Sequence, residues 1–333
     1  MESMLPFVLR QPPTVAEAAR LLSALPDARV LAGGTDLVPN LRRRIDRPAV
    51  LIDVHAIPEL AAIRHDGARL VLGAGVTLAS VAANERIAQR YLALAQAARS
   101  VAAPGHRAAA TIGGNLCLDT RCVFYNHSEW WREANGYCLK RGGDVCHVAP
   151  QGERCHAAYS GDLAAALLAL DAEVEIVSTR GRRAMPLDAL YRDDGAAHLT
   201  LARDELLVQV RIPAPAARSL SGYRKSRVRG AIDFPLAGVA CALAMRDGVV
   251  SQLRIAITGA NSRPIVLADT DALLGRAVDD ALLAALTKLV QKQVSPMRTT
   301  LVQANHRRQV AAVLARRLVA ELAHAGLAPT QVT

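Results

Sequence analysis

Five of the six cysteines lie between residues 117 and 155, and this clustering constrains the chain more than any other feature of its sequence. In a chain without an export signal, such thiols are more often metal ligands than disulfide partners, because the cytosol keeps them reduced. The N-terminal apolar stretch is too short for a signal peptide, and no apolar run reaches the length of a membrane span. We therefore expect a soluble, cytoplasmic protein with a metal-binding segment. The clustered residues are Cys117, Cys122, Cys138, Cys146 and Cys155.

The spacing of these cysteines, C-x4-C-x15-C-x7-C-x8-C, limits the choice of metal. Zinc sites usually bring ligands in tight pairs, which only Cys117 and Cys122 approach, and the C-x2-C pairs of common ferredoxins are also absent. Aromatic residues between the second and third cysteines favour an iron-sulfur cluster, because bulky side chains can bury it. A loop with free thiols and a small aromatic core stays open as the alternative. The aromatic residues are Phe124, Tyr125, Trp130, Trp131 and Tyr137.

The length of 333 residues predicts two or three domains with sizeable cores. A net charge of +10 permits a nucleic-acid partner, but the basic residues are scattered in short groups such as Arg42-Arg43-Arg44. These groups lack interleaved aromatic residues and any DNA-reading motif, so we expect no nucleic acid. Docking of acidic proteins and solvated helix faces both explain the charge.

A strand-turn-helix pattern surrounds the first Gly-Gly pair. The apolar run 29–32 precedes Gly33-Gly34-Thr35-Asp36, and a helical pattern follows through Leu37 and Leu41. Two glycines let the backbone approach a ligand closely, and Thr35 or Asp36 is expected to cap the helix. Such a turn suits a pyrophosphate, although it is neither a Walker loop nor a Rossmann fingerprint. An ordinary tight turn is the alternative.

A second Gly-Gly pair lies at residues 111–115, Thr-Ile-Gly-Gly-Asn, and the two turns are candidates to close on one ligand from both sides. Strands at 50–54, 70–77 and 174–177, with helices at 78–97 and 163–170, indicate an α/β or α+β domain. Asp162 opens the second of these helices as a possible cap. After a linker at 213–217 we expect paired strands at 236–246 and 252–258, and amphipathic helices at 278–293 and 307–324.

These motifs, in this order, resemble the FAD-binding medium subunits of the molybdenum hydroxylase (xanthine dehydrogenase) family over nearly the whole length. The resemblance implies an α+β fold, with a two-part FAD-binding domain at 1–216 and a smaller C-terminal α+β domain at 217–333. Most members lack the cysteine segment. Here the insertion 117–156 looks like that of 4-hydroxybenzoyl-CoA reductase β subunits, which implies a [4Fe–4S] cluster bound by Cys122, Cys138, Cys146 and Cys155.

The resemblance also implies the FAD contacts. Residues 32–37 would wrap the pyrophosphate and the ribityl chain, with a second wall formed near residue 111. Asp162 would contact the adenosine part, Leu206 the isoalloxazine ring and Lys225 its polar edge. No residue of this chain is expected to be catalytic. The implied FAD-binding residues are Ala32, Gly33, Gly34, Thr35, Asp36, Leu37, Thr111, Gly114, Asn115, Asp162, Leu206 and Lys225.

The implied function is electron transfer within a molybdenum oxidoreductase, and the implied partners are a large molybdenum-cofactor subunit and a small [2Fe–2S] subunit in a dimer of heterotrimers. Electrons would pass from ferredoxin through [4Fe–4S] and FAD, for reductive dehydroxylation of 4-hydroxybenzoyl-CoA to benzoyl-CoA. Two alternatives stay open. One is the FAD subunit of an oxidative molybdenum hydroxylase of an aromatic or heterocyclic substrate. The other is a metal-stabilised basic scaffold or nucleic-acid-binding module.

Overall fold

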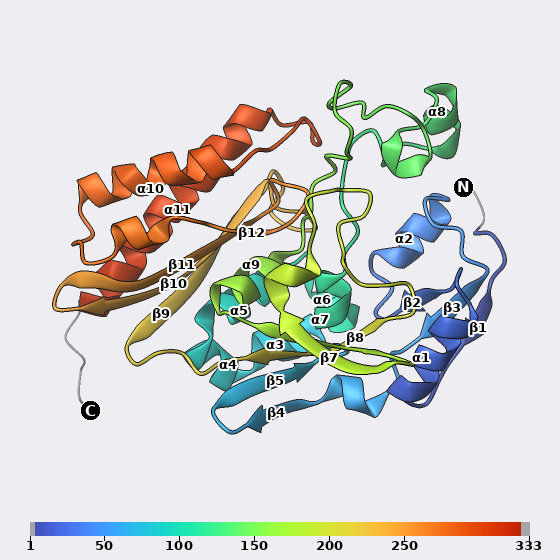
Figure 1. Cartoon of the computed structure of the whole chain (residues 1–333), viewed down its shortest axis with the longest axis horizontal. Coiled ribbons are helices and arrows are strands. Elements are labelled where there is room, and N and C mark those ends of the chain that lie inside the picture. Colours follow the sequence, from blue (N-terminus) through green and yellow to red (C-terminus); the bar gives the residue numbers. More distant parts are fainter. Residues whose placement is uncertain (1–3, 328–333) are drawn as a thin grey trace.

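The computed structural model describes residues 4–327, which form three sheets with helices between and around them (Figure 1). The N-terminal sheet is parallel, in the order β1-β3-β2, and α1 packs beside it. Thr14 caps α1 by accepting a hydrogen bond from the Glu17 N–H. The elements are β1 (Val8–Arg10), α1 (Val15–Ala24), β2 (Arg29–Leu31), α2 (Leu37–Arg42) and β3 (Val50–Asp53).

The second sheet has five antiparallel strands in the order β4-β5-β8-β6-β7. A 3-10 turn, η1 (Pro58–Ala61), precedes its first strand, and another, η3 (Leu187–Leu190), follows β7 directly in the chain. Apolar residues of the inner strands β6 and β8, among them Val174, Ile176 and Val210, are buried in the main core. The strands are β4 (Ile63–Asp66), β5 (Arg69–Gly73), β6 (Glu173–Ser178), β7 (Gly181–Pro186) and β8 (Leu206–Ile212).

The helix expected at 78–97 is three short helices. Asn84 ends the first and caps the second, because its side chain accepts a hydrogen bond from the Ile87 N–H. Tyr91 then separates the second helix from the third. The prediction of one helix was wrong because the apolar spacing continues across both breaks. The helices from here to the second Gly-Gly turn are α3 (Leu78–Ala83), α4 (Glu85–Arg90), α5 (Leu92–Ser100), α6 (Pro104–Ala109) and α7 (Ile112–Leu116).

Helix α9 (Asp162–Ala169) lies at the centre of the molecule, and all eight of its residues are buried. Its alanines and leucines favour a helix and allow close packing on every side. It contacts α5 and α7 on one side and the third sheet on the other (Figure 1). The helix therefore connects the second Gly-Gly turn with the C-terminal part of the chain.

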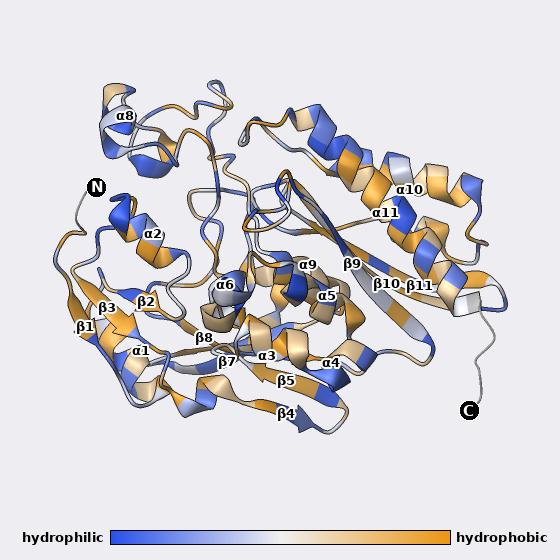
Figure 2. Ribbon diagram, turned by 180° about the vertical axis from the view of Figure 1, so that it is seen from behind, coloured by the Kyte–Doolittle hydropathy of each residue, from blue (hydrophilic) through white to orange (hydrophobic). Residues whose placement is uncertain are grey.

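The third sheet is antiparallel, in the order β12-β11-β10-β9, with α5 and α9 on one face and α10 and α11 on the other. The expected strand pair and both C-terminal helices are confirmed. Figure 2 shows orange and blue alternating along α10 and α11, as amphipathic helices require. The elements are β9 (Ser219–Ser226), β10 (Ala237–Arg246), β11 (Val249–Thr258), β12 (Ile265–Val266), η4 (Thr270–Leu273), α10 (Asp280–Gln293) and α11 (Ala304–Leu327).

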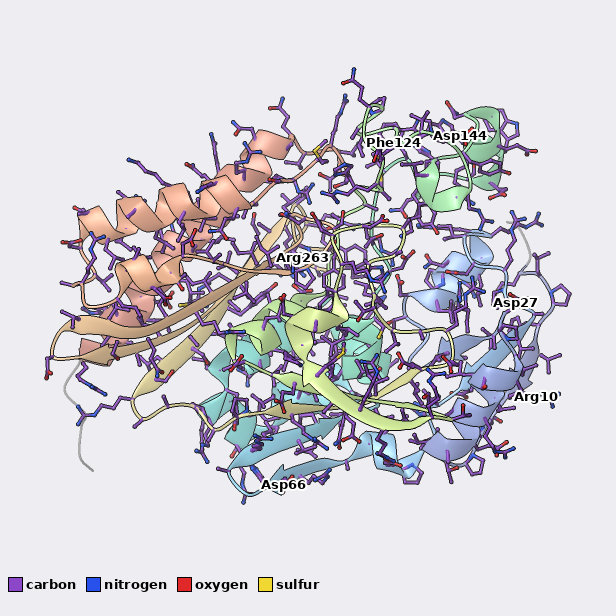
Figure 3. All side chains as sticks on the ribbon, in the orientation of Figure 1. Arg10, Asp27, Asp66, Phe124, Asp144 and Arg263 are labelled. Atoms are coloured by element: carbon purple, nitrogen blue, oxygen red, sulfur yellow. The ribbon has the colours of Figure 1, made fainter. Side chains whose placement is uncertain are left out.

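The cysteine segment forms a lobe that projects beside α2 (Figure 1). Its two ends are joined by backbone pairing of Arg121 with Ala158, in which each N–H donates to the other's carbonyl at 2.7 Å. The lobe contains little regular structure, namely α8 (Glu129–Ala134) and η2 (Leu139–Arg141). Figure 3 labels Phe124 and Asp144 within it.

The expected α+β class is confirmed. The domain boundary predicted after residue 216 falls between β8 and β9, and it stays a prediction. Within residues 4–327, no helix combines the length and the apolar character that are needed to cross a bilayer.

Candidate functional site

A cleft of about 650 Å³ lies between the first Gly-Gly turn, one side of α2 and the start of α6. The two Gly-Gly turns are neighbours, because Gly33 packs against the end of α6 just before Thr111. A Cβ added to Gly33 would lie only 1.8 Å from the Ala109 carbonyl oxygen, so no other residue fits there without movement of the backbone. The cleft is lined by Gly33, Gly34, Thr35, Val38, Pro39, Arg42, Arg43, Gly105 and His106.

The first turn has backbone donors that are free to bind a ligand. From Gly33 to Leu37, none of the amide N–H groups has a hydrogen-bond acceptor among residues 4–327. Gly34 adopts φ +68°, a left-handed conformation that favours glycine. A run of free amides beside a cleft suits an anion such as a pyrophosphate. We call residues 33–37 the cradle.

The capping role predicted for Thr35 or Asp36 was wrong. Asp36 occupies the N-cap position of α2, but no side chain makes a capping hydrogen bond there. The carboxylate of Asp36 instead forms an ion pair with Arg121 and accepts a hydrogen bond from the Asn40 side chain at 3.4 Å. The strong charge of Arg121, which comes from a distant part of the chain, outcompetes a local cap.

The second Gly-Gly turn already uses its backbone donors inside the protein. The N–H of Gly113 donates to the Ala74 carbonyl at 2.7 Å, and that of Gly114 donates to Thr111 Oγ1 at 3.1 Å. The N–H of Asn115 donates to the Thr111 carbonyl at 2.9 Å, and Asn115 Oδ1 accepts from the Leu163 N–H at 3.0 Å. FAD contacts by Thr111, Gly114 and Asn115 stay predictions, and these residues do not line the cleft.

Asp162 and Lys225 contact each other across the junction of α9 and β9. Their charged groups lie 3.0 Å apart, and each side chain is only 4% exposed. Tyr223 donates its hydroxyl hydrogen bond to Asp162 at 2.6 Å. Burial raises the pKa of Asp162, while Lys225 and the Tyr223 hydroxyl act in the opposite direction. The Asp162 carboxylate contacts Lys225 and Tyr223 and makes no capping hydrogen bond to α9, so the predicted role as a helix cap was wrong.

Leu206 lies at the start of β8, is 5% exposed and belongs to the main core. Neither Leu206 nor the pair of Asp162 and Lys225 lines the cleft beside the cradle. Their proposed contacts with the flavin ring or the adenosine part stay predictions.

The four cysteines assigned as cluster ligands gather in the lobe. Burial raises the pKa of Cys122, and the neighbouring Cys138 and Cys146 raise it further. Burial also raises the pKa of Cys155 to about 12, with smaller contributions from Cys146 and Cys122. Ile45, which follows α2, packs against Cys122 and Cys155. The short segment 33–45 thus contains the cradle at its start, and its last residue, Ile45, contacts two of the cysteines.

The other two cysteines lie elsewhere. Cys117 ends α7 and packs against the main core, whereas Cys241 is fully buried in β10. Within residues 4–327, no three His, Cys, Asp or Glu side chains are placed to hold a single metal ion. This finding concerns one ion, whereas in a cubane the four thiolates bind four different irons.

The aromatic residues of the lobe differ in how far their side chains are buried. Tyr125 is buried and lies under Lys140, whose Nζ is 4.5 Å from the ring centroid. Trp131 stacks on His127 at 4.1 Å. Trp130 is 74% exposed, so the expectation that it helps to bury a cluster was wrong. Trp130 is the second residue of α8, and most of its side chain faces solvent.

Sequence reasoning missed four candidate residues. Arg42, Arg43 and His106 line the cleft, and Arg121 contacts the cradle. Arg42 and Arg43 counted only as scattered basic residues, because their position beside the cleft depends on how α2 and α6 pack. Arg121 could have been noticed from its place directly before Cys122.

Comparisons with known proteins agree with this architecture. Residues 5–215 match the family model described as the FAD binding domain in molybdopterin dehydrogenase, and residues 221–322 match the CO dehydrogenase flavoprotein C-terminal domain. The chain is 33% identical to the aldehyde oxidoreductase FAD-binding subunit of Escherichia coli (strain K12), over 84% of this chain and 90% of that protein.

Two further similarities involve carbon monoxide dehydrogenase. The chain is 30% identical to the medium chain from Hydrogenophaga pseudoflava, over 81% of each protein. A solved structure of carbon monoxide dehydrogenase from the same organism, which lacks the Mo-pyranopterin moiety, superposes with a TM-score of 0.79. That match has 27% identity and covers 97% of this chain and 99% of the other.

Proposed function

Because the chain belongs to the molybdenum hydroxylase family as one of its FAD-binding subunits, we propose that it also holds a [4Fe–4S] cluster and transfers electrons between cluster and flavin. The observation that carries this proposal is the gathering of four thiols in one lobe that packs on the segment bearing the cradle. We propose residues 1–216 and 217–333 as the two domains. Because the chain belongs to this family, we do not propose the alternative function of a basic scaffold or nucleic-acid-binding module.

The cradle residues fit the pyrophosphate of FAD. Five amide N–H groups that have no acceptor within the described residues 4–327 supply donors, and Arg42, Arg43 and His106 supply further polar groups along the same cleft. Gly33 allows this turn to pack against the end of α6, because a Cβ at this position would overlap the Ala109 carbonyl oxygen.

The lobe fits a cluster in a different way. Cys122, Cys146 and Cys155 are buried and Cys138 is partly exposed, so the thiols face a largely apolar environment that includes Ile45 and Ala157. The charge of Lys140 acts to lower the pKa of Cys155 and therefore favours its thiolate form. Such surroundings limit water contact and influence the potential of a cluster.

When bound, FAD exchanges one or two electrons, whereas a [4Fe–4S] cluster exchanges one. We propose a complex similar to 4-hydroxybenzoyl-CoA reductase, with a large molybdenum-cofactor subunit and a small [2Fe–2S] subunit in a dimer of heterotrimers. In this complex, ferredoxin supplies electrons for the reductive dehydroxylation of 4-hydroxybenzoyl-CoA to benzoyl-CoA. The chain's own residues bind and orient the cofactors and exclude water from them.

Single serine variants of all six cysteines test the cluster. Ser at Cys122, Cys138, Cys146 or Cys155 should lower the iron content and abolish the low-temperature EPR signal of the reduced protein. Ser at Cys117 or Cys241 should leave about four irons per chain, because these thiols lie outside the lobe's thiol group. If Cys117→Ser lost iron and Cys122→Ser kept it, the ligand assignment would be wrong. If no variant or parent contained iron, the cluster proposal would fail.

A second candidate is an oxidative molybdenum hydroxylase, and the similarity to aldehyde oxidoreductase and carbon monoxide dehydrogenase subunits favours it. The purified complex separates the two candidates. Reduced ferredoxin should support benzoyl-CoA formation under the first, whereas an aldehyde or heterocycle should bleach the flavin under the second. Reduction of the flavin by such a substrate, with no dehydroxylation, would reject the reductive function.

The charge of the lobe bears on ferredoxin docking. Residues 117–156 contain five Lys or Arg and five Asp or Glu, so the net charge of +10 lies outside the lobe. Electrostatic docking would therefore use the neighbouring surface, which includes Arg42 and Arg43. Reduction rates that are the same at low and high ionic strength would reject charge-guided docking while leaving the cluster untouched.

A further inference from the structure

Arg121 connects the cradle to the cysteine lobe. Its backbone pairs with Ala158 and closes the stem of the lobe, directly before Cys122. Its guanidinium forms an ion pair with Asp36 in the cradle and donates to Asn40 Oδ1 at 3.4 Å. The Arg121 side chain is 11% exposed and that of Asp36 is 27% exposed, so solvent screens this pair only partly.

The contact matters because Asp36 is an acidic residue within a turn suited to an anion. A free carboxylate there would repel a pyrophosphate, which carries negative charge itself. Among residues 4–327, Arg121 is the one basic group in ion-pair contact with Asp36. Phe234, from the loop after β9, covers the guanidinium at 5.0 Å and keeps it in place.

We propose that Arg121 is a positioning residue that neutralises Asp36 and thereby couples FAD binding to the ordered stem of the cysteine lobe. The electrostatic part requires only that FAD binds at the cradle. The coupling to a cluster rests on the proposed function. By linkage, a stem that supports FAD binding must itself be stabilised when FAD binds.

A double-mutant cycle tests the electrostatic part. Arg121→Gln leaves Asp36 unpaired, so the Kd for FAD should rise at least about tenfold. Adding Asp36→Asn removes the repelling charge, and the double variant should recover to within about threefold of the parent. A purely structural role for Arg121 would show no such recovery. Fluorescence titration of the deflavinated protein with FAD measures all four forms.

Two single variants serve as comparisons for the FAD titration of Arg121→Gln. Asp36→Asn alone removes the repelling carboxylate and leaves the Arg121 charge in place, so it should bind FAD at least as tightly as the parent does. Arg47→Gln is the matched control, because Arg47 also follows α2 and pairs with a lobe residue, Glu129, but does not contact the cradle. It should leave the Kd unchanged. A Kd for Arg121→Gln equal to that of Arg47→Gln would overturn the proposal, as would a double variant no better than Arg121→Gln.

Limited proteolysis tests the coupling. Removing FAD from the parent should increase the cleavage rate within residues 117–156 several-fold, and the same removal from Arg121→Gln should change it little. Equal protection of the lobe with and without FAD in the parent would reject the coupling. A parent without iron would reject the proposed cluster function, while the FAD titrations would still decide the role of Arg121.

Discussion

The two Gly-Gly turns contain the same dipeptide and lie against each other, yet they use their backbone differently. In the first turn, none of five consecutive amides has a hydrogen-bond acceptor among residues 4–327. In the second turn, the amides of Gly113 and Gly114 donate to Ala74 and Thr111. The first turn is therefore suited to a ligand, and the second serves as a brace that positions α9 through Asn115.

The difference teaches that a glycine pair can serve close packing as well as ligand binding. Gly33 and Gly113 both allow backbone segments to approach, because a Cβ at either would meet a neighbour within 3 Å. Gly34 serves a left-handed bend, whereas a Cβ at Gly114 would have one close neighbour, Thr111 Oγ1 at 3.1 Å. Four substitutions test these assignments.

The largest effect is expected for Gly33→Ala. The new Cβ would lie 1.8 Å from the Ala109 carbonyl oxygen, and only a movement of the backbone can relieve the overlap. We expect loss of most bound FAD and a decrease in unfolding free energy of about 3 kcal/mol. Flavin absorbance of the purified protein and urea denaturation measure the two effects. Full flavin content would show that the cradle is misplaced.

Gly113→Ala should destabilise the fold without removing FAD. Its Cβ would lie 2.9 Å from the Ala74 Cβ, so the brace must shift, at a cost of about 1–3 kcal/mol. The donors of the cradle are unaffected, and the Kd for FAD should stay within about threefold. The same urea and flavin measurements apply. A stable variant that has lost FAD would contradict the assignment of this turn as a brace.

Thr111→Val probes the cap of α7. Thr111 is 2% exposed, and its hydroxyl accepts the hydrogen bond of the Gly114 N–H. Losing this cap should lower the free energy of unfolding by about 1 kcal/mol. Thermal denaturation provides the measurement, with Thr77→Val, which removes the cap of α3, as the matched control. Loss of FAD at unchanged stability would instead make Thr111 a direct cofactor contact.

The smallest effect is expected for Gly114→Ala. The added Cβ would meet only Thr111 Oγ1, at 3.1 Å, and alanine favours the helical conformation of α7. We expect a stability change below about 0.5 kcal/mol and unchanged flavin content. An FAD-free but folded Gly114→Ala protein would place the second turn in the cofactor site after all, and the contrast between the two turns would disappear.

Local patterns were enough to predict several elements. The strand-turn-helix at the cradle, the pairing of β10 with β11 and the helices α10 and α11 depend on apolar spacing and glycine positions within short windows. The breaks between α3, α4 and α5 escaped notice. They depend on the cap at Asn84 and on Tyr91, where the backbone leaves the helical conformation. The spacing of apolar residues continues unchanged across both positions.

Residue patterns and the family resemblance of the sequence determined the fold class and the FAD-binding family, and the resemblance implied the set of four cysteines, whose role as ligands stays a prediction. Tertiary structure alone decided which amides are free, since the acceptors Ala74 and Val76 lie far from residues 112 and 113 in the chain. It also decided the exposure of Trp130 and the pairing of Asp36 with Arg121. Those properties depend on which distant groups meet, and short-range spacing contains no information about such meetings.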